Sequence, residues 1–218
     1  MNRRRLALVA LFGSALGVAR AQAPVAPPAA LQVTGVSYPL GVQVAGSPLQ
    51  LNGAGTRYKF IIKVYTAGLY LTAKAGTPEA VTAAPGPKRL HVVMLREIDA
   101  NELGKLFTRG MQDNAPREEF AKSIPGTIRM GEIFAAKKKL VAGENFGVEW
   151  VPGVGAQVLV NGKPMSDPIK EPEFFNGLLR IWLGKSPADS ALKESLLGRP
   201  PQQRSFSSEG SPRFQCNK

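Results

Sequence analysis

The stretch that decides the fold runs from residue 52 to residue 71 and reads NGAGTRYKFIIKVYTAGLYL. Its second half is rich in β-branched and aromatic side chains, which suit a pleated, half-buried surface. We predict strands over residues 58–65 and 67–73. Every second side chain of a strand faces the same side of the sheet. The spacing therefore predicts that Arg57, Lys59 and Lys63 put three positive charges on one face.

Further strands and helices follow in blocks on both sides of this stretch. Apolar alternation predicts strands over residues 31–36, 42–44, 49–51, 88–95, 145–151 and 156–160. Helical spacing, caps and glycine stops predict helices over residues 77–84, from Asp99, after Pro116, over 171–183 and over 190–197. The helix after Pro116 is expected to bury Ile124 and Ile128 and to be interrupted at Pro125-Gly126. Blocks of strands and of helices, in place of regular alternation, predict an α+β domain with an antiparallel sheet.

The two ends of the chain differ from its body. Three arginines precede an apolar run at residues 6–19, which is too short for a bilayer span but fits the core of a secretory signal. We predict a signal peptide over residues 1–21, a Pro/Ala linker over 22–30, one domain over 31–198 and a disordered tail over 199–218. The mature protein is then periplasmic or secreted, with no stable membrane span after cleavage.

Composition excludes several kinds of chemistry. One Cys and one His cannot supply a Cys/His zinc cluster or an internal disulfide, so no metal and no cofactor are expected. The formal charge of +12 belongs partly to the signal, with +4, and to the tail, with +3, which leaves +5 for the body. A dispersed excess of that size does not indicate a nucleic-acid partner. The oligomeric state does not follow from the sequence.

Two stretches resemble a known family. Residues 52–57 (NGAGTR) followed by 60–71 (FIIKVYTAGLYL) are similar to the segment of chalcone isomerases that runs from a Gly-x-Arg to a Gly-x-Tyr-Leu. The closing stretch resembles the exported bacterial branch of chalcone isomerase-like proteins, through residues 147–153 (GVEWVPG), 158–163 (VLVNGK), 174–175 (FF) and 181–184 (IWLG). The resemblance covers residues 31–198 and implies an open-faced β-sandwich, with an antiparallel sheet and helices packed on one face.

The same resemblance implies candidate site residues. Plant members of the family cyclise a phenolic chalcone, with an arginine that stabilises charge and a Thr, a Tyr and water at the ketone oxygen. Other members bind fatty acids, with the arginine on the ligand carboxylate. The family's Gly-x-Arg falls on Gly55-Thr56-Arg57, and a guanidinium offers a planar fork to a carboxylate or a phenolate. The family's Thr falls on Tyr65, while Thr66 is one residue out of register and, without a bulge, on the opposite face.

The sequence therefore favours a binding protein over an enzyme. We expect an exported protein that binds a small amphipathic anion, such as a fatty or an aromatic acid, through Arg57, Lys59, Tyr65 and Thr66. The alternative is an intramolecular lyase of the chalcone isomerase type with Arg57 and Tyr65 as catalytic residues. A plain arginine paired with Glu97 or Glu149 and a partly exposed His91 are the structural interpretations of the same residues.

Overall fold

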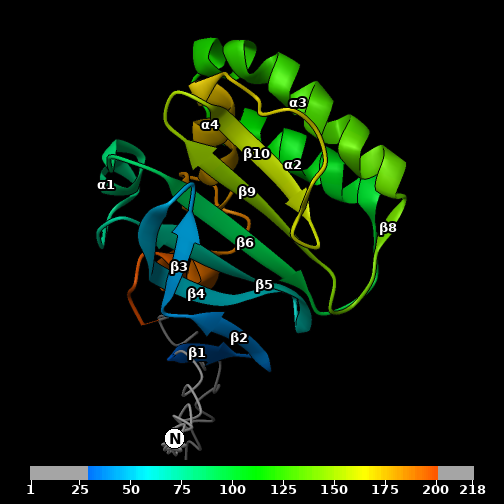
Figure 1. The fold of residues 1–218 in the computed structure, drawn as a ribbon. Helices are drawn as coiled ribbons and strands as arrows, with labels where there is room; N and C mark the ends of the chain where they lie inside the picture. The colour runs from blue at the N-terminus through cyan, green and yellow to red at the C-terminus, as the bar shows by residue number, and fades with distance from the viewer. Residues whose placement is uncertain (1–28, 201–218) are drawn as a thin grey trace, which may run out of the picture.

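An antiparallel sheet forms the centre of the computed structural model, which describes residues 29–200 (Figure 1). Seven strands lie in the order β11-β10-β9-β6-β5-β4-β3, each antiparallel to its neighbours. In chain order they are β3 (Gly41–Val44), β4 (Ser47–Lys59), β5 (Ile62–Leu71), β6 (Lys88–Met94), β9 (Asn145–Val151), β10 (Gly155–Val160) and β11 (Lys163–Pro164). Two short pairs complete the strands: β1 (Ala30–Val33) with β2 (Val36–Pro39), and β7 (Ile98–Asp99) with β8 (Lys139–Leu140).

Helices cover one face of this sheet. They are α1 (Pro78–Ala83), α2 (Ala100–Asn114), α3 (Arg117–Lys137), α4 (Pro172–Leu183) and α5 (Ser190–Leu196). Helices α2 and α4 lie behind the sheet, and α3 packs against both of them at the upper right (Figure 1). Between them and the strands, Phe107 lies with its ring 5.4–5.8 Å from the rings of Phe134, Phe146 and Trp182. The predicted α+β fold with helices on one face is confirmed.

The other face of the sheet is covered in part by the β1–β2 hairpin. Tyr38 of β2 is fully buried and packs with Leu49 and Leu51 of β4 and with Tyr70 of β5. These residues form a second, smaller core, separate from the one under the helices. Strands β4 and β5 are therefore sandwiched between two apolar layers, which fixes the direction of every side chain along them.

Local signals at the helix ends have the predicted effect. The Thr77 hydroxyl accepts a hydrogen bond from the Ala80 amide, and the Asp99 carboxylate accepts one from the Glu102 amide. Gly198 ends α5 with a φ of +73°, the left-handed conformation that glycine favours. Gly184 ends α4 as predicted, but with a φ of −71° and not in the left-handed conformation. A Cβ at Gly184 would overlap the Asn114 carboxamide, and this contact explains the glycine.

Helix α3 corrects two sequence predictions. It runs unbroken through Pro125, and Ile124 and Ile128 lie on its exposed side. Around Pro125 the buried side is made of small residues such as Ser123 and Gly126, and farther along it carries Met130, Ile133 and Phe134. A Cβ at Gly126 would lie 2.8 Å from the Phe174 ring, so α3 packs against α4 more closely than a row of isoleucines would allow. This packing outweighs the one hydrogen bond that Pro125 removes.

A second correction concerns the deciding stretch. Residues 58–65 were expected to form one strand, but β4 ends at Lys59 and β5 begins at Ile62. Phe60 and Ile61 form a two-residue loop between Lys59 and Ile62, which are paired across the hairpin. Neither loop residue is a usual turn former. A search of the sequence for Gly, Asn, Asp or Pro therefore does not identify this turn.

Two residues just outside the predicted domain of residues 31–198 take part in the described structure. Ala30, assigned to the linker, is the first residue of β1. Arg199, assigned to the tail, pairs with Glu194 at 2.6 Å. The predicted signal peptide and most of the linker and tail lie outside the described residues. Within residues 29–200, no helix combines the length and the apolar character that crossing a membrane requires.

Candidate functional site

Arg57 lies near the end of β4, on the face that the helices cover. It is paired across the strands with Tyr65 of β5. Earlier in the same strand, Gly53 and Gly55 face α5, and a Cβ at Gly53 would overlap the carbonyl oxygen of Ser195. Gly53 and Gly55 thus let α5 approach the sheet next to Arg57.

A small cavity adjoins Arg57. Its volume is about 70 Å³, and it is lined by Arg57, Tyr65, Leu103, Leu106, Phe107, Gly110, Ile181, Ser186 and Ala188. Most of these side chains are apolar, and the guanidinium is the one charged group among them. At about 15 Å³ for each water, such a space holds roughly five water molecules. It therefore has room for a carboxylate and a few carbon atoms.

The Arg57 guanidinium is incompletely paired. Its Nε is buried and has no hydrogen-bond partner among the described residues. Its Cζ lies 5.5 Å from the centre of the Tyr65 ring, a cation–π contact. A buried N–H without an acceptor costs about 1–3 kcal/mol. An acceptor for this N–H would remove that cost.

Tyr65 is held in place and kept neutral. Its hydroxyl accepts a hydrogen bond of 2.8 Å from the indole nitrogen of Trp182 in α4. Burial raises the pKa of Tyr65 to about 12, although Arg57 and the Trp182 hydrogen bond act in the opposite direction. The side chain is 2% exposed. Tyr65 therefore carries its proton at neutral pH and forms a fixed wall of the cavity.

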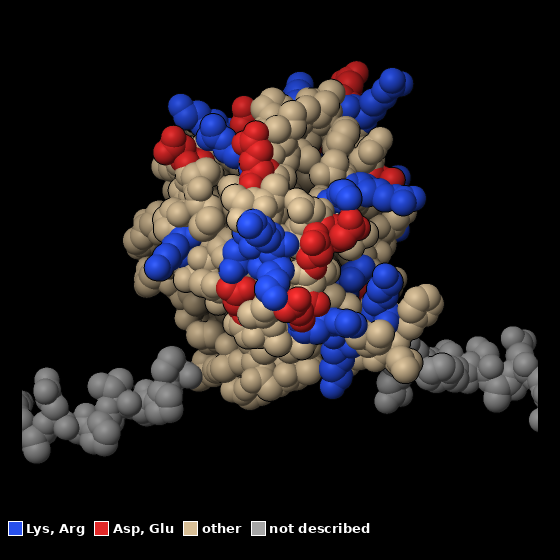
Figure 2. Space-filling view, turned by 90° about the vertical axis from the view of Figure 1, so that its right-hand side faces the viewer, with Lys and Arg blue, Asp and Glu red and all other residues tan. Residues whose placement is uncertain are grey.

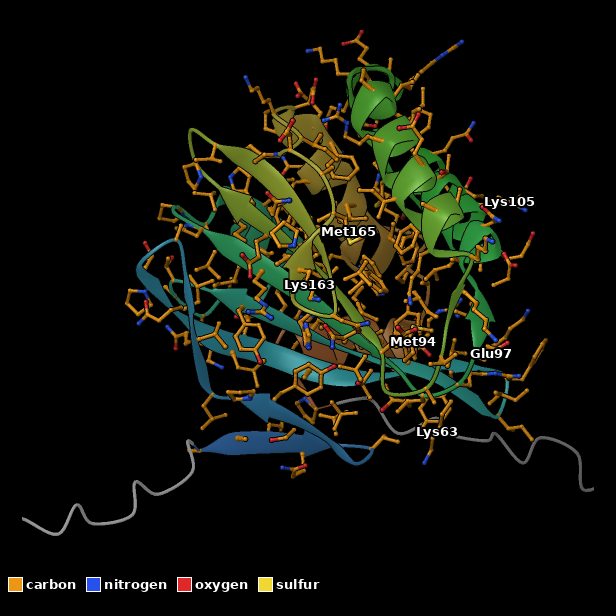
Figure 3. The ribbon with its side chains drawn as sticks, turned by 45° about the vertical axis from the view of Figure 1, so that its right-hand side comes forward. Lys63, Met94, Glu97, Lys105, Lys163 and Met165 are labelled. Atoms are coloured by element: carbon orange, nitrogen blue, oxygen red, sulfur yellow. The ribbon has the colours of Figure 1, made fainter. Side chains whose placement is uncertain are left out.

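A β-bulge brings Tyr65 to the Arg57 face. Because the loop has two residues, Ile62 is paired with Lys59 and faces the same side of the sheet. Lys63 is paired with Tyr58 and faces the other side. The pairing then shifts at Val64, so that Tyr65 faces Arg57. The prediction of three charges on one face is wrong for Lys63, which points away from the helices (Figure 3). Lys59 is exposed and does not line the cavity.

Thr66 lies on the opposite side of β5 from Tyr65. It is fully buried, and its hydroxyl accepts a hydrogen bond of 2.8 Å from Tyr38. The structure thus brings Arg57 and Tyr65 together and separates Thr66 from both. The alternation argument for Thr66 agrees with this placement, whereas its assignment to the same ligand site does not.

The expected acidic partners of Arg57 are paired elsewhere. Glu149 lies 3.3 Å from Arg89, and Glu97 lies 3.1 Å from Lys139. His91 lies beside Tyr38 on the face away from the cavity, with ring centres 6.1 Å apart. Burial, with a contribution from Arg89, lowers the pKa of His91 to about 4. His91 is therefore neutral at physiological pH and remote from Arg57.

Comparison with known proteins now places the chain. The sequence model described as chalcone isomerase-like matches residues 30–198. The chain belongs to the chalcone isomerase-like family. A solved structure with a similar fold is that of a fatty-acid binding protein from Arabidopsis thaliana, with a TM-score of 0.59 and 15% sequence identity. The match covers 75% of this chain and 92% of that one. No curated protein sequence matches the chain.

The sequence did not identify the residues that form the apolar wall of the cavity. Leu103, Leu106 and Phe107 of α2 had been assigned to a helix by their spacing, but not to a site. Ile181 of α4 and Ala188 after it complete the wall. These residues come together only because α2 and α4, which follow later in the sequence, pack on β4 and β5. The apolar spacing of α2 was the one sequence signal that could have pointed to them.

Charge on the surface is mixed. On the face shown in Figure 2, basic and acidic side chains are interspersed. In the described part of the chain, no group of three or more His, Cys, Asp or Glu side chains could hold a metal ion. Apart from Ser186, the cavity is lined by one guanidinium, one neutral phenol and apolar residues.

Proposed function

We propose that this chalcone isomerase-like protein is exported and binds a small amphipathic acid, such as a fatty or an aromatic acid. The ligand carboxylate lies against Arg57, and its apolar part contacts Leu103, Leu106 and Phe107. The buried Nε of Arg57, without a partner at the wall of an apolar cavity, carries the proposal. A carboxylate oxygen satisfies this donor and neutralises the guanidinium at the same time.

The size of the cavity sets a condition on the ligand. With about 70 Å³, the cavity holds the carboxyl end and a few further atoms. The chain of a longer acid then leaves past Leu106, whose side chain is 48% exposed at the cavity. Each methylene that is buried contributes about 0.8 kcal/mol, or roughly a four-fold gain in affinity. Affinity should rise with chain length while the cavity fills, and then level off.

Titration of substituted proteins tests the role of Arg57. Arg57→Ala should fold normally and lose about 1.5–3 kcal/mol of binding free energy, or roughly 10- to 150-fold in affinity, because a charge-assisted hydrogen bond is lost. Arg57→Lys should recover only part of the loss, since an ammonium lacks the planar fork. Calorimetry with a series of fatty acids of increasing length, and with benzoic and cinnamic acids, measures both effects.

Arg89→Lys is the matched control. Arg89 also has a buried Nε without a hydrogen-bond partner among the described residues, but it pairs with Glu149 and lines no part of the cavity. Its substitution should leave acid affinity unchanged. Equal affinity in wild type, Arg57→Ala and Arg57→Lys would remove Arg57 from the binding site.

An intramolecular lyase is the second candidate, and one observation favours it. Tyr65 is a neutral phenol next to a guanidinium, so it could donate a hydrogen bond to a ketone oxygen while Arg57 stabilises a phenolate. We nevertheless expect no cyclisation, because Tyr65 occupies the place of the threonine in the plant enzymes. An assay of chalcone turnover by wild type and Arg57→Ala decides the point. Turnover that depends on Arg57 would favour the lyase.

A further inference from the structure

The loop between β4 and β5 exposes three consecutive apolar residues. Phe60 is 84% exposed, Ile61 91% and Ile62 46%. A run of three exposed apolar side chains opposes folding and solubility unless it has a use. We call residues 58–63 the hairpin tip.

The hairpin tip projects beyond the rest of the sheet. On one side β3 pairs with β4 only as far as Gln50. On the other side β6 pairs with β5 only from Tyr65 onward. Residues 58–63 are therefore a two-stranded extension that no neighbouring strand covers. A projecting hairpin suits insertion into a soft surface better than reception of a ligand.

The backbone of the loop adopts a strained conformation at Phe60. Phe60 has a φ of +57°, and among the described non-glycine residues Ile61 is not one with positive φ. A positive φ at only the first loop position is the pattern of a type II′ turn, which takes glycine at that position. A bulky residue there is an outlier. The sequence places an exposed aromatic ring where glycine would be more stable.

Basic side chains flank the apolar residues. Residues 57–63 read RYKFIIK, with three positive charges and no acid. Lys59 and Lys63 lie on opposite faces of the hairpin, so each face carries one exposed ammonium behind the apolar tip. Glu97, which lies on the same side of the molecule as the tip, is neutralised by Lys139 (Figure 3). Asp189 is 8% exposed and accepts a hydrogen bond from the Tyr58 amide.

We propose that the hairpin tip docks the protein onto the surface of a lipid bilayer that carries anionic headgroups. Phe60 and Ile61 insert at the boundary between headgroups and acyl chains, Tyr58 lies at the depth that interfacial aromatics occupy, and the two lysines contact anionic lipid. Three apolar side chains cannot supply the roughly 800 Å² per partner that a stable protein interface buries. A bilayer requires no such area.

Vesicle sedimentation with the full chain tests the docking surface. Every variant keeps the same N-terminus, so any contribution of residues 6–19 is common to all of them. Wild type should bind vesicles of phosphatidylcholine with phosphatidylglycerol more tightly than vesicles of phosphatidylcholine alone. The double variant Phe60→Gly/Ile61→Asn should lose at least about ten-fold in partitioning. Glycine suits the strained position, so this variant should melt no lower than wild type.

Three further variants test the roles of the charge, of the position of the apolar residues and of their insertion. Lys59→Gln/Lys63→Gln should lose about five-fold for each lysine, on anionic vesicles only. Ile124→Asn/Ile128→Asn, which alters two exposed isoleucines of α3, is the matched control and should partition as wild type does. The fluorescence of the tryptophan introduced by Ile61→Trp should shift to shorter wavelength when the protein binds anionic vesicles.

Three results would overturn the proposal. The first is wild-type partitioning that does not depend on phosphatidylglycerol. The second is equal partitioning of Phe60→Gly/Ile61→Asn and wild type. The third is a wild-type oligomer, formed without lipid, that dissociates in Phe60→Gly/Ile61→Asn. That result would assign the hairpin tip to a protein interface. No acid is added in these assays, so they do not depend on binding at Arg57.

Discussion

Adjacent residues of β5 perform opposite tasks. Tyr65 faces Arg57 and Trp182 in the core under the helices, and Thr66 faces Tyr38 in the smaller core. A displacement of one residue is a change of face, and here it also changes the partner from a guanidinium to a phenol. The resemblance to the family predicts a threonine at the position of Tyr65. The cavity wall carries a phenol here instead.

At the same scale, His91 makes stability depend on pH. Its pKa is near 4 in the folded protein and about 6.5 in the unfolded chain. As pH falls below 6.5, the unfolded state takes up a proton that the folded state refuses, so stability decreases until pH reaches about 4. We expect His91→Gln to lack this loss, which amounts to roughly 1–3 kcal/mol. The two proteins should diverge between pH 6.5 and pH 4.

Denaturant unfolding of both proteins at pH 7.5, 5.5 and 4 checks the prediction. Carboxylates that titrate in the same range affect wild type and variant alike, so the difference between them isolates His91. A constant difference across the three pH values would show that folding does not change the pKa of His91.

Some residue assignments followed from the sequence, and others depended on tertiary contacts. The caps at Thr77 and Asp99 were predicted from local pattern, and Arg57 and Tyr65 were singled out by the family resemblance. Lys63 was assigned to the wrong face because parity along a strand cannot be counted through an unrecognised turn and a bulge. The lack of an acidic partner for Arg57 Nε depends on where Glu97 and Glu149 lie in space, which no local pattern encodes.

At the scale of elements, close packing explains departures from propensity. Helix α3 stays continuous through Pro125 because small residues let it lie against α2 and α4. Strand β4 keeps glycines at positions 53 and 55 because α5 rests on them. Periodicity predicted that these elements exist, but it could not predict which side of α3 faces inward. The exposed isoleucines and the buried Ser123 and Gly126 reverse the usual hydrophobic pattern.

Two glycine substitutions test this explanation with opposite signs. Gly131 lies within α3, and nothing lies within 4 Å of where its Cβ would be. Gly131→Ala should therefore stabilise the protein by about 0.5–1 kcal/mol, because alanine loses less entropy in a helix. Gly53→Ala should destabilise it by roughly 3 kcal/mol, because the methyl group meets the Ser195 carbonyl.

Thermal unfolding of both variants beside wild type measures the pair. A Gly53→Ala protein as stable as wild type would mean that α5 does not press on β4. A destabilised Gly131→Ala protein would mean that the outer side of α3 is covered.

For the whole molecule, the antiparallel sheet followed from block patterning and the layer of helices on one face from the family resemblance, whereas the order of the strands was not predicted. The family match over residues 30–198 agrees with a single domain flanked by two segments of different composition. The cavity could not have been predicted in its size, since its volume is what remains after α2 and α4 pack on β4 and β5. A change in any of these contacts would alter it.

Processing of the whole chain remains a sequence prediction. The basic and apolar N-terminus indicates cleavage after Ala21, so that the mature protein begins at Gln22. N-terminal sequencing of the protein recovered from the extracellular or periplasmic fraction should return Gln22 or a close neighbour. Recovery of intact Met1 in membranes would rule out the secretory interpretation.

The central claim is that a ligand carboxylate lies against Arg57. Titration of a fatty acid with a ¹³C-labelled carboxyl carbon, followed by NMR in the bound state, tests this contact directly. In wild type the guanidinium should hold the pKa of the bound carboxyl well below that of the free acid, because the charged form is favoured. In Arg57→Ala the bound carboxyl should titrate at or above the free value, because the apolar wall disfavours its charge. The same titration in both proteins would contradict the contact between carboxylate and Arg57.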